Sequence, residues 1–507
     1  MKKYIKSILA LVIAAGTTVS CDDKLDINVN PTQPVTTPSN LRLPAIISNT
    51  AYHLYSHARF SAYHSYYMTS RTGNSNAIID NWNYNNITRQ GAWRWHYFDV
   101  GSNIMGMIDR AEQEGSNNYL GVGKILLAFS YLTATDSFGD MPFTEAYSGS
   151  YNPVYDSQEK VYEGIATLLE EGLTALGRVS SAAVRMDDKS DAIYGGNLEH
   201  WKSFGLAVKS RLQLHTANFK GSNQETLATV NAALANYADA IFKYPKESSN
   251  AWGKNLWGES AAQPEWQFAD IKNMVSTSVP TDFLIDALTV DKAGNGYDPR
   301  LKVLTSPGKN NKYFGAKLSE GLRDTDLPTG TTADDFPNLN LGYWTSDNSP
   351  YPFILKEELF FIKSELHFHM NQTAQAYDAM IDGIKLNMSR MGIQEGEMLN
   401  YLSSAKVPSS SADLKLADIM MQKWIALYLQ SESWVDMRRY NYSQNAYPNI
   451  YYPKNALAEW GGKWIQRFPY DPQTEYIYNP REIARLGAEA RNWCFTPVWW
   501  AENSSLK

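Results

Sequence analysis

The sequence is poor in cysteine and in basic charge, and it lacks any long apolar run. Two cysteines, Cys21 and Cys494, occur among 507 residues, so at most one internal disulfide is possible and disulfides do not hold the fold. The formal net charge of −7 argues against nucleic acid or anionic lipid as a partner, because both need basic patches. A membrane-spanning helix needs about 20 apolar residues, and none is expected here.

Motifs that would carry catalysis are also lacking. Gly121-Val-Gly-Lys124 does not have the spacing of a phosphate-binding loop, and His53-Leu-Tyr-Ser-His57 lacks the glutamate of the zinc-protease motif. There is no Gly-x-Ser-x-Gly nucleophile elbow. A glycosidase needs two carboxylates at a defined separation, and no pair can be singled out among 53 acidic residues. We therefore predict a protein that is not an enzyme and has no metal site and no cofactor.

The N-terminus has the layout of a secreted lipoprotein. A lysine-rich start precedes a short apolar run at 8–15, small residues follow, and Cys21 stands where a signal peptidase would cut. We predict a signal peptide over 1–20 and lipidation of Cys21, although Thr18 occupies the position where a lipobox usually has Leu. The anchor would hold the protein at a membrane surface.

An ordinary signal peptide is the alternative reading of this segment. Cys21 would then be a free thiol or would pair with Cys494, the one other cysteine. In either case residues 21–40, which contain three prolines and little periodicity, are predicted to form a linker to the body of the protein.

Helical periodicity dominates the body, residues 41–507. Apolar residues recur at spacings of three and four, which predicts a helical scaffold over 41–244 and 353–440. Residues 245–352 and 441–507 are rich in proline and aromatic residues and carry no long apolar stripe, so we predict an irregular insertion and an irregular C-terminal segment. The predicted fold class is mainly all-α, made of helical hairpins of a repeat type with a loop-rich ligand-binding portion.

Aromatic residues are abundant, with 15 Trp and 32 Tyr, and most are expected in the core. Sugars present apolar CH faces and hydroxyl groups, so an aromatic ring beside Asn or Asp in a loop is typical of a sugar site. Packing of each ring beneath its loop is the alternative. We predict that exposed rings in three such loops contact a ligand: Trp82, Tyr84, Trp257, Trp266, Tyr343 and Trp344.

Five ordered segments carry a family resemblance. Residues 127–147 (LAFSYLTATDSFGDMPFTEAY) are similar to a helix followed by D-x-x-G-D-x-P-F, and 196–214 (GNLEHWKSFGLAVKSRLQL) to a G-N-x-x-x-W-x-K-F stretch. Residues 297–301 (YDPRL), 351–367 and 422–439 (QKWIALYLQSESWVDMRR) follow in the same order as their counterparts. Together they make the chain resemble the SusD/RagB family of outer-membrane nutrient-binding lipoproteins.

This resemblance implies tetratricopeptide-like helical hairpins, with the irregular segments forming the ligand face. It also implies a lipid-anchored protein on the outer face of the outer membrane of a Gram-negative bacterium, working with a SusC-like TonB-dependent transporter. We therefore predict capture of oligosaccharides and their delivery to that transporter, with peptide capture as the alternative. Two alternative functions belong to other classes of protein: a surface-anchored glycoside hydrolase, and a purely structural subunit of the transporter.

Overall fold

The computed structural model describes residues 37–71, 77–84, 91–180, 185–245, 253–261, 275–291, 296–322, 327 and 329–506. The chain divides into two units, Met1–Pro38 and Ser39–Lys507, and the described helices and strands all belong to the second unit. The predicted signal peptide, Cys21 and most of the predicted linker lie outside the described residues. Among the described helices, none combines the length and the apolar composition that crossing a bilayer requires.

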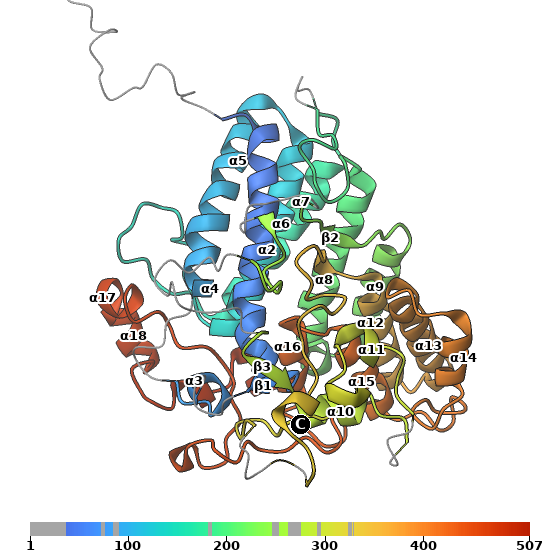
Figure 1. The fold of residues 1–507 in the computed structure, drawn as a ribbon. Coiled ribbons are helices and arrows are strands. Elements are labelled where there is room, and N and C mark those ends of the chain that lie inside the picture. Colours follow the sequence, from blue (N-terminus) through green and yellow to red (C-terminus); the bar gives the residue numbers. More distant parts are fainter. Residues whose placement is uncertain are drawn as a thin grey trace, which may run out of the picture. The chain divides into compact units, whose positions relative to one another are not determined.

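The first part of this unit consists of long helices: α2 (Ser39–His64), α5 (Ser102–Glu114), α6 (Asn117–Phe138), α7 (Gln158–Leu176), α8 (Leu198–Lys220) and α9 (Asn223–Leu234). Helix α6 packs against both α5 and α7, α7 against α8, and α8 against α9, so successive helices form hairpins (Figure 1). The ends of α8 show the local signals: the Asn197 side chain accepts from the N–H of Glu199 at 3.0 Å, and Gly221 ends the helix with φ of +67°.

A second group of helices follows the irregular middle of the chain: α12 (Lys356–His369), α13 (Thr373–Arg390), α14 (Glu395–Leu402), α15 (Leu416–Ala426) and α16 (Glu432–Arg439). Helices α12 and α13 form a hairpin, and α12 also packs against α15 and α9. The contact between α9 and α12 joins the two groups into one helical body. The prediction of a mainly all-α fold built from helical hairpins is confirmed.

Strands are few and short among the described residues. Strand β1 (Met68–Ser70) pairs antiparallel with β3 (Ser278–Pro280), and β2 (Ala240–Phe242) pairs antiparallel with β4 (Tyr351–Ile354). The pairings tie the irregular middle of the chain to the first helical group. The remaining elements are short: α3 (Ala77–Asp80), α4 (Gly91–Arg94), the π-helix η2 (Trp95–Gly101), α10 (Asp282–Ala287), α11 (Leu301–Leu304), η4 (Lys309–Asn311), η5 (Ala333–Asp335), η6 (Ala458–Trp460), α17 (Glu475–Tyr478), α18 (Pro480–Leu486), η7 (Trp493–Phe495) and α19 (Trp499–Asn503).

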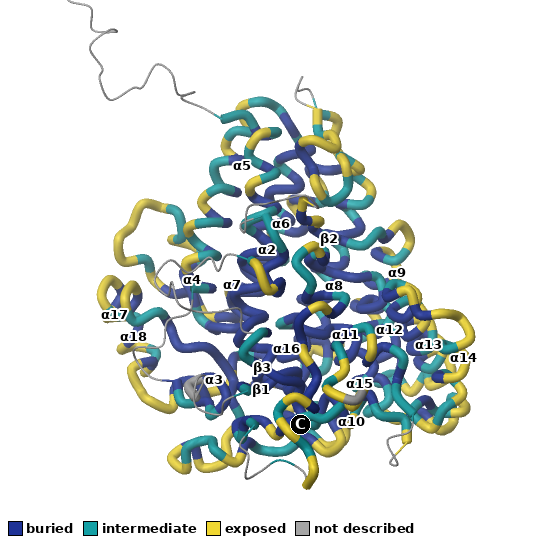
Figure 2. Tube along the Cα trace, viewed as in Figure 1, coloured by how far each residue is buried: buried dark blue, intermediate teal, exposed yellow. Residues whose placement is uncertain are grey.

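The long helices α2 and α6 are buried over most of their length (Figure 2). Helix α6 is buried on nearly all sides, including polar residues such as Ser130 and Asp136, which is the pattern of a helix surrounded by protein. Helix α2 also buries polar side chains, including His53 and His57, whose rings lie 4.7 Å apart. His53 bonds the Ser130 carbonyl at 3.2 Å and His57 the Ser137 hydroxyl at 2.7 Å, so both histidines join α2 to α6.

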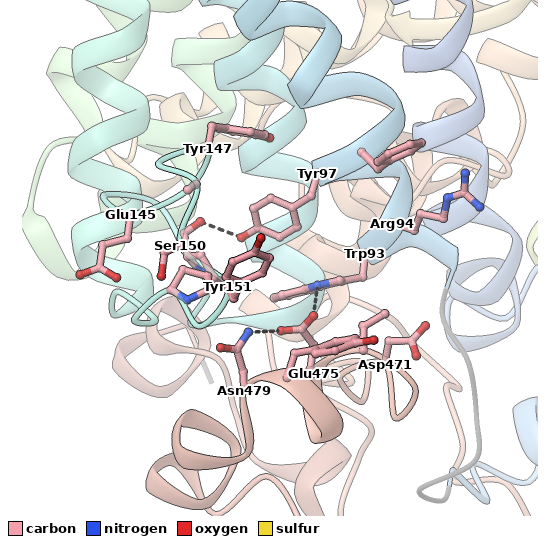
Figure 3. Close-up of a pocket in the computed structure, with 16 residues that line it drawn as sticks. Trp93, Arg94, Tyr97, Glu145, Tyr147, Ser150, Tyr151, Asp471, Glu475 and Asn479 are labelled. Carbon is pink, nitrogen blue, oxygen red and sulfur yellow. Dashed lines mark hydrogen bonds between the residues drawn. The ribbon is translucent and has the colours of Figure 1, made fainter. Parts of the chain in front are cut away.

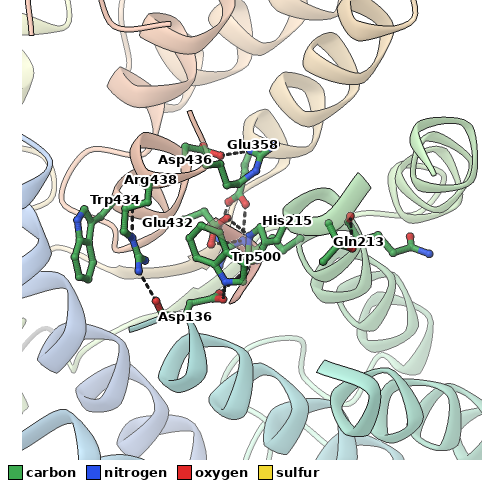
Figure 4. Close-up of polar contacts among 12 residues, drawn as sticks. Asp136, Gln213, His215, Glu358, Glu432, Trp434, Asp436, Arg438 and Trp500 are labelled. Atoms are coloured by element: carbon green, nitrogen blue, oxygen red, sulfur yellow. Dashed lines mark hydrogen bonds and ion pairs between the residues drawn. The ribbon is translucent and has the colours of Figure 1, made fainter. Parts of the chain in front are cut away.

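A buried polar network connects α6, α8, α16 and α19 (Figure 4). His215 lies 2.8 Å from Glu432 through Nε2, and its Nδ1 lies 2.9 Å from the Tyr162 hydroxyl and 3.5 Å from Asp136. The Trp500 indole N–H donates to Asp136 at 2.9 Å. Although burial alone would lower the pKa of His215, the carboxylates of Asp136 and Glu432 raise this pKa from 6.5 to about 9.

Further ion pairs extend the network to α12. Arg211 pairs with Glu358 through two bonds of 2.5 and 2.6 Å, and all four groups of a second set, Lys423, Glu365, Asp436 and Arg439, are buried together. Removing one partner of a buried ion pair leaves an uncompensated charge, which typically costs about 3–5 kcal/mol. Arg211 also lies 3.8 Å from Glu432. Four of the five segments that carry the family resemblance, all except 297–301, therefore contribute charged side chains to these buried ion pairs.

The raised pKa of His215 predicts a specific dependence of stability on pH. Because the folded state holds the His215 proton more tightly than the unfolded chain, its stabilisation is complete below pH 6.5 and is lost as the pH rises through about 9. The difference in unfolding free energy between wild type and His215→Gln should fall by on the order of 3 kcal/mol across this range. Chemical denaturation at both ends of the range measures it.

The matched control is His200→Gln on the same helix, where His200 is half-buried and contacts Tyr194. Its difference from wild type should stay constant across the range. A constant difference for His215→Gln as well would contradict a proton held between Asp136 and Glu432.

Candidate ligand-binding pocket

Four of the six aromatic residues predicted to contact a ligand are buried. The exposed fraction is 0% for Trp82, 1% for Tyr84, 2% for Trp257 and 3% for Trp344, so the prediction that these rings are exposed is wrong. Tyr343 is half-buried and stays a prediction, and Trp266 lies outside the described residues.

The physical reason is that these loops fold back onto the helices. Trp257 packs edge-on against Tyr55 of α2 at 4.8 Å between ring centroids, and the Tyr84 hydroxyl lies 2.8 Å from His64 Nε2. The polar neighbours that suggested hydroxyl binding serve the loops themselves, because the Asn255 amide donates to the Trp344 carbonyl at 2.7 Å. The alternative reading, rings packed beneath their loops, is the one that the structure supports.

A different set of aromatic residues surrounds an open pocket of about 730 Å³ (Figure 3). Its walls come from α4 and η2, from the connection between α6 and α7, and from the segment that contains α17. Its lining combines apolar rings with a few polar groups, which is the composition of small-molecule sites. The lining residues are Trp93, Arg94, Tyr97, Phe98, Pro142, Glu145, Ala146, Tyr147, Ser150, Tyr151, Pro153, Asp471, Thr474, Glu475, Tyr478 and Asn479.

The π-helix η2 shapes one wall. Single π-helical turns are rare and occur frequently at functional sites. At its end, a Cβ atom on Gly101 would lie 1.7 Å from the Tyr147 hydroxyl, so glycine is needed for the tyrosine of the α6–α7 connection to dock there. The Tyr97 hydroxyl donates to the Pro142 carbonyl at 2.7 Å, which ties the same connection to η2 a second time.

The base of the α6–α7 connection is closed by Asp156. Its carboxylate accepts from the N–H groups of Phe143 at 3.1 Å and Thr144 at 2.7 Å, and Lys160 lies 2.5 Å away. Burial acts in the opposite direction, but Lys160 and these donors hold the pKa of Asp156 below its usual value. The connection is therefore a fixed loop at its base, and its far part, which carries Tyr151, extends over the pocket.

Glu475 is the centre of the pocket floor. One of its oxygens accepts from the Trp93 indole N–H at 2.8 Å, and the other accepts from the Tyr155 hydroxyl and from the Asn479 amide, the latter at 2.9 Å. Figure 3 shows the bonds to Glu475 from Trp93, on α4, and from Asn479, four residues further along the chain. Buried carboxylates need such donors, and Glu475 thus joins the C-terminal segment to α4.

Three rings at the rim face solvent. The exposed fraction is 63% for Phe98, 92% for Tyr151 and 60% for Tyr478, and one comes from each wall of the pocket. Exposed apolar residues are common when scattered singly, but several gathered around one pocket are typical of a binding site. The pocket therefore offers several apolar faces for stacking above a polar floor.

The sequence reasoning missed this pocket because its residues come from connections that were assigned to the scaffold or to the C-terminal segment. A signal was present: Tyr147 and Tyr151 flank Gly149 and Ser150, the same mixture of rings and turn residues used to choose the other loops. Composition alone could not separate these loops, because it does not say on which side of a loop the helices lie.

Asp136, His215 and Glu432 are the one group of described residues whose ligand atoms lie close enough to hold a metal ion. A metal-binding imidazole must be neutral. The raised pKa of His215 instead favours an imidazolium between two carboxylates. The hydrogen bonds of the group support the same reading, since Tyr162 and Trp500 already occupy its remaining positions.

The fold and the pocket together define a mainly helical protein with an open, aromatic-lined pocket. Residues 31–470 match a family model named SusD-like and described as starch-binding and associating with the outer membrane. Because this match covers most of the chain, the protein belongs to the SusD-like family. A comparison with curated proteins gave no match.

Solved structures share the fold at low sequence identity. One described as a chitin-binding protein has a TM-score of 0.69 and 19% identity, covering 92% of this chain and 100% of its own. A SusD/RagB family protein from Bacteroides thetaiotaomicron has a TM-score of 0.67 and 19% identity, with coverages of 92% and 99%. A chitin-binding SusD homologue from Flavobacterium johnsoniae has a TM-score of 0.65 and 17% identity, with coverages of 91% and 98%.

The burial of Trp82 and Trp257 predicts that both residues act on stability. Trp82→Ala and Trp257→Ala should each lower the unfolding free energy by about 3–5 kcal/mol, the usual cost of removing a large ring from a core. Chemical denaturation measures this loss. If either variant kept wild-type stability, the ring would not be part of the core.

Proposed function

We propose that the protein is a non-enzymatic capture protein for oligosaccharides, which bind in the pocket between η2, the α6–α7 connection and α17. The observation that carries this proposal is the set of exposed rings, Phe98, Tyr151 and Tyr478, above a polar floor. Each ring can stack on the apolar face of a sugar, while carboxylate, amide and hydroxyl groups bond the sugar hydroxyls. Membership of a starch-binding family supports the ligand class.

The identity of the sugar is part of the proposal. The family description names starch, whereas two of the similar structures are described as chitin-binding. The pocket is wide and open on one side, which suits a chain of several sugar units better than one enclosed monosaccharide. We therefore include both α-glucans and chitin oligomers among the candidate ligands.

We further propose that the captured oligosaccharide passes to a SusC-like TonB-dependent transporter. The support is the family, described as associating with the outer membrane, together with the lipoprotein layout of the N-terminus. In this arrangement a lipid on Cys21 holds the protein at the outer face of the outer membrane, and residues 21–40 link the anchor to the helical body. Peptide capture for the same kind of transporter is the alternative to be tested.

Removing a rim ring should weaken binding without unfolding the protein. Phe98→Ala, Tyr151→Ala and Tyr478→Ala should each raise the Kd for the bound oligosaccharide by about ten-fold, since a stacked aromatic residue is a typical centre of binding energy. Exposed substitutions usually change stability by about 0.5 kcal/mol or less. Calorimetric titration with maltohexaose, chitohexaose, xylohexaose, mannohexaose and mixed peptides measures the affinities.

Leu399→Ala is the matched control, because Leu399 is an exposed apolar residue on α14, away from the pocket. Binding of peptides alone would move the assignment to peptide capture. Shortening of any bound oligosaccharide by the purified protein would favour a glycoside hydrolase, and wild-type affinity in all three rim variants would place the ligand elsewhere.

The lipid anchor has a test of its own. Cells that express the protein and are fed a fatty-acid analogue should label the wild type, and Cys21→Ala should carry no label because the acceptor thiol is absent. Cys494→Ala is the control, since Cys494 is buried in the folded body and should leave labelling unchanged. Label on the Cys21→Ala protein would contradict the anchor.

A further inference from the structure

We propose that the binding site continues over α17 into a second pocket, so that one oligosaccharide chain occupies both pockets and long chains are the preferred ligands. This inference rests on the proposed function and deepens it, because it concerns the length of the captured chain. Three features carry it: a second pocket borders α17, exposed apolar side chains connect the two pockets, and hydrogen bonds hold both pockets in place.

The second pocket has a volume of about 450 Å³ and is lined by α17 and by the chain that follows α18. Tyr84 and Trp493 line it but are more than nine-tenths buried, so they form its floor. Tyr476, on α17, is half-buried, and residues 489–491 are exposed. The Tyr476 ring and residues 489–491 are therefore the parts of this pocket that a ligand can reach.

The turn of α17 carries apolar side chains from one pocket to the other. Glu475 and Tyr478 line the first pocket, and Tyr476 lines the second. Successive residues of an α-helix are turned by about 100°, so Tyr476, Ile477 and Tyr478 follow one another around the helix. Ile477, between them, lines neither pocket and is 62% exposed, next to Tyr478 at 60%. An exposed apolar path thus crosses the outer side of α17, which lies at the edge of the helical body (Figure 1).

The accessible groups of the second pocket suit a sugar chain. Tyr476 offers a ring whose orientation is fixed, because its hydroxyl donates to the Ala488 carbonyl at 2.7 Å. Arg491 pairs with Glu459 at 2.9 Å, and both side chains are about half exposed. A guanidinium carries several N–H donors, so this one pair leaves donors for sugar hydroxyls, and Glu489 adds a carboxylate acceptor. The second pocket thus repeats the combination of a ring with hydroxyl-binding groups.

Hydrogen bonds hold α17 from both sides. Toward the first pocket, Glu475 accepts from the Trp93 N–H at 2.8 Å and from the Asn479 amide at 2.9 Å. Toward the second, the Tyr476 hydroxyl is bonded to the Ala488 carbonyl. The spacing between the two pockets is therefore fixed, and little ordering entropy is lost when a chain binds across α17.

A ligand that reaches both pockets gains affinity from its length. Once one part of the chain is bound in the first pocket, binding of the next part in the second pocket is intramolecular and takes place at a high effective concentration. A helix with its side chains is about 10–12 Å across, so the chain must be longer than this to reach both pockets. Short oligosaccharides are therefore limited to one pocket at a time.

The test is calorimetric titration of the purified protein with malto-, chito-, xylo- and manno-oligosaccharides, each as a series from the disaccharide to the octasaccharide. In the series that binds, the Kd should fall about 100-fold between the disaccharide and the octasaccharide, the lower end of the gain expected from two linked sites. A Kd that does not fall with length would overturn the inference while leaving oligosaccharide capture intact. Binding of no oligosaccharide would remove the proposed function, and the inference with it.

Tyr476→Ala tests the second pocket. The ratio of the disaccharide Kd to the octasaccharide Kd should fall about ten-fold, because the long chain loses a ring contact that the short chain does not use. The ratio is taken within one variant, so a change in the first pocket that affects both ligands cancels. Tyr476→Phe keeps the ring and should keep a ratio close to that of the wild type. A wild-type ratio in Tyr476→Ala would overturn the inference.

Ile477→Asn tests the path over α17 without changing the lining of either pocket. Because Ile477 is exposed, the substitution should leave the protein folded. The ratio of the two Kd values should fall about five-fold, since the long chain loses an apolar contact where it crosses the helix. Val179→Asn is the matched control, an equally polar change at a residue that is 91% exposed and lines neither pocket, and its ratio should equal that of the wild type. Equal ratios in Ile477→Asn and Val179→Asn would show that the chain does not cross α17 and would overturn the inference.

Discussion

The buried network around His215 is the interaction on which the rest of the structure depends. It sets an imidazolium between the carboxylates of Asp136 and Glu432 and surrounds them with Tyr162 and Trp500. A buried charge is stabilised only if its partners are held in good geometry, and the loss of one partner leaves the remaining charge buried without compensation. The helices that supply these groups must therefore be placed together, in one arrangement, for the fold to form.

The same network reaches the pocket. Arg438 donates to the Asp136 carbonyl at 2.6 Å, at the C-terminal end of α6, and to the Gln466 carbonyl at 2.8 Å. The first contact fixes the point where the α6–α7 connection begins, and the second fixes the chain that leads to α17. Phe468 N–H then donates to the Ser137 carbonyl at 2.7 Å, so two segments far apart in sequence leave the core side by side. The pocket walls are positioned by the core even though their rims are exposed.

Periodicity and motif order were enough to predict the helical class and the family, because both depend on local spacing. The loops that line the pocket were harder to predict, because the loops around Trp82 and Trp257 have a local composition similar to that of the loop around Tyr151. What separates them is whether a loop folds over α2 or away from it, and that depends on tertiary contacts such as the packing of Trp257 on Tyr55.

Under the proposed function the protein must bind an oligosaccharide and also release it, and the pocket has features that suit both steps. Its floor is rigid, because Trp93, Tyr155 and Asn479 all donate to one carboxylate, so little ordering entropy is lost there on binding. Its rim carries exposed rings, Phe98, Tyr151 and Tyr478, whose apolar faces are open for stacking. If oligosaccharides bind here as proposed, affinity would come from several ring contacts along the sugar chain, and the fixed polar floor would set how the chain lies between them.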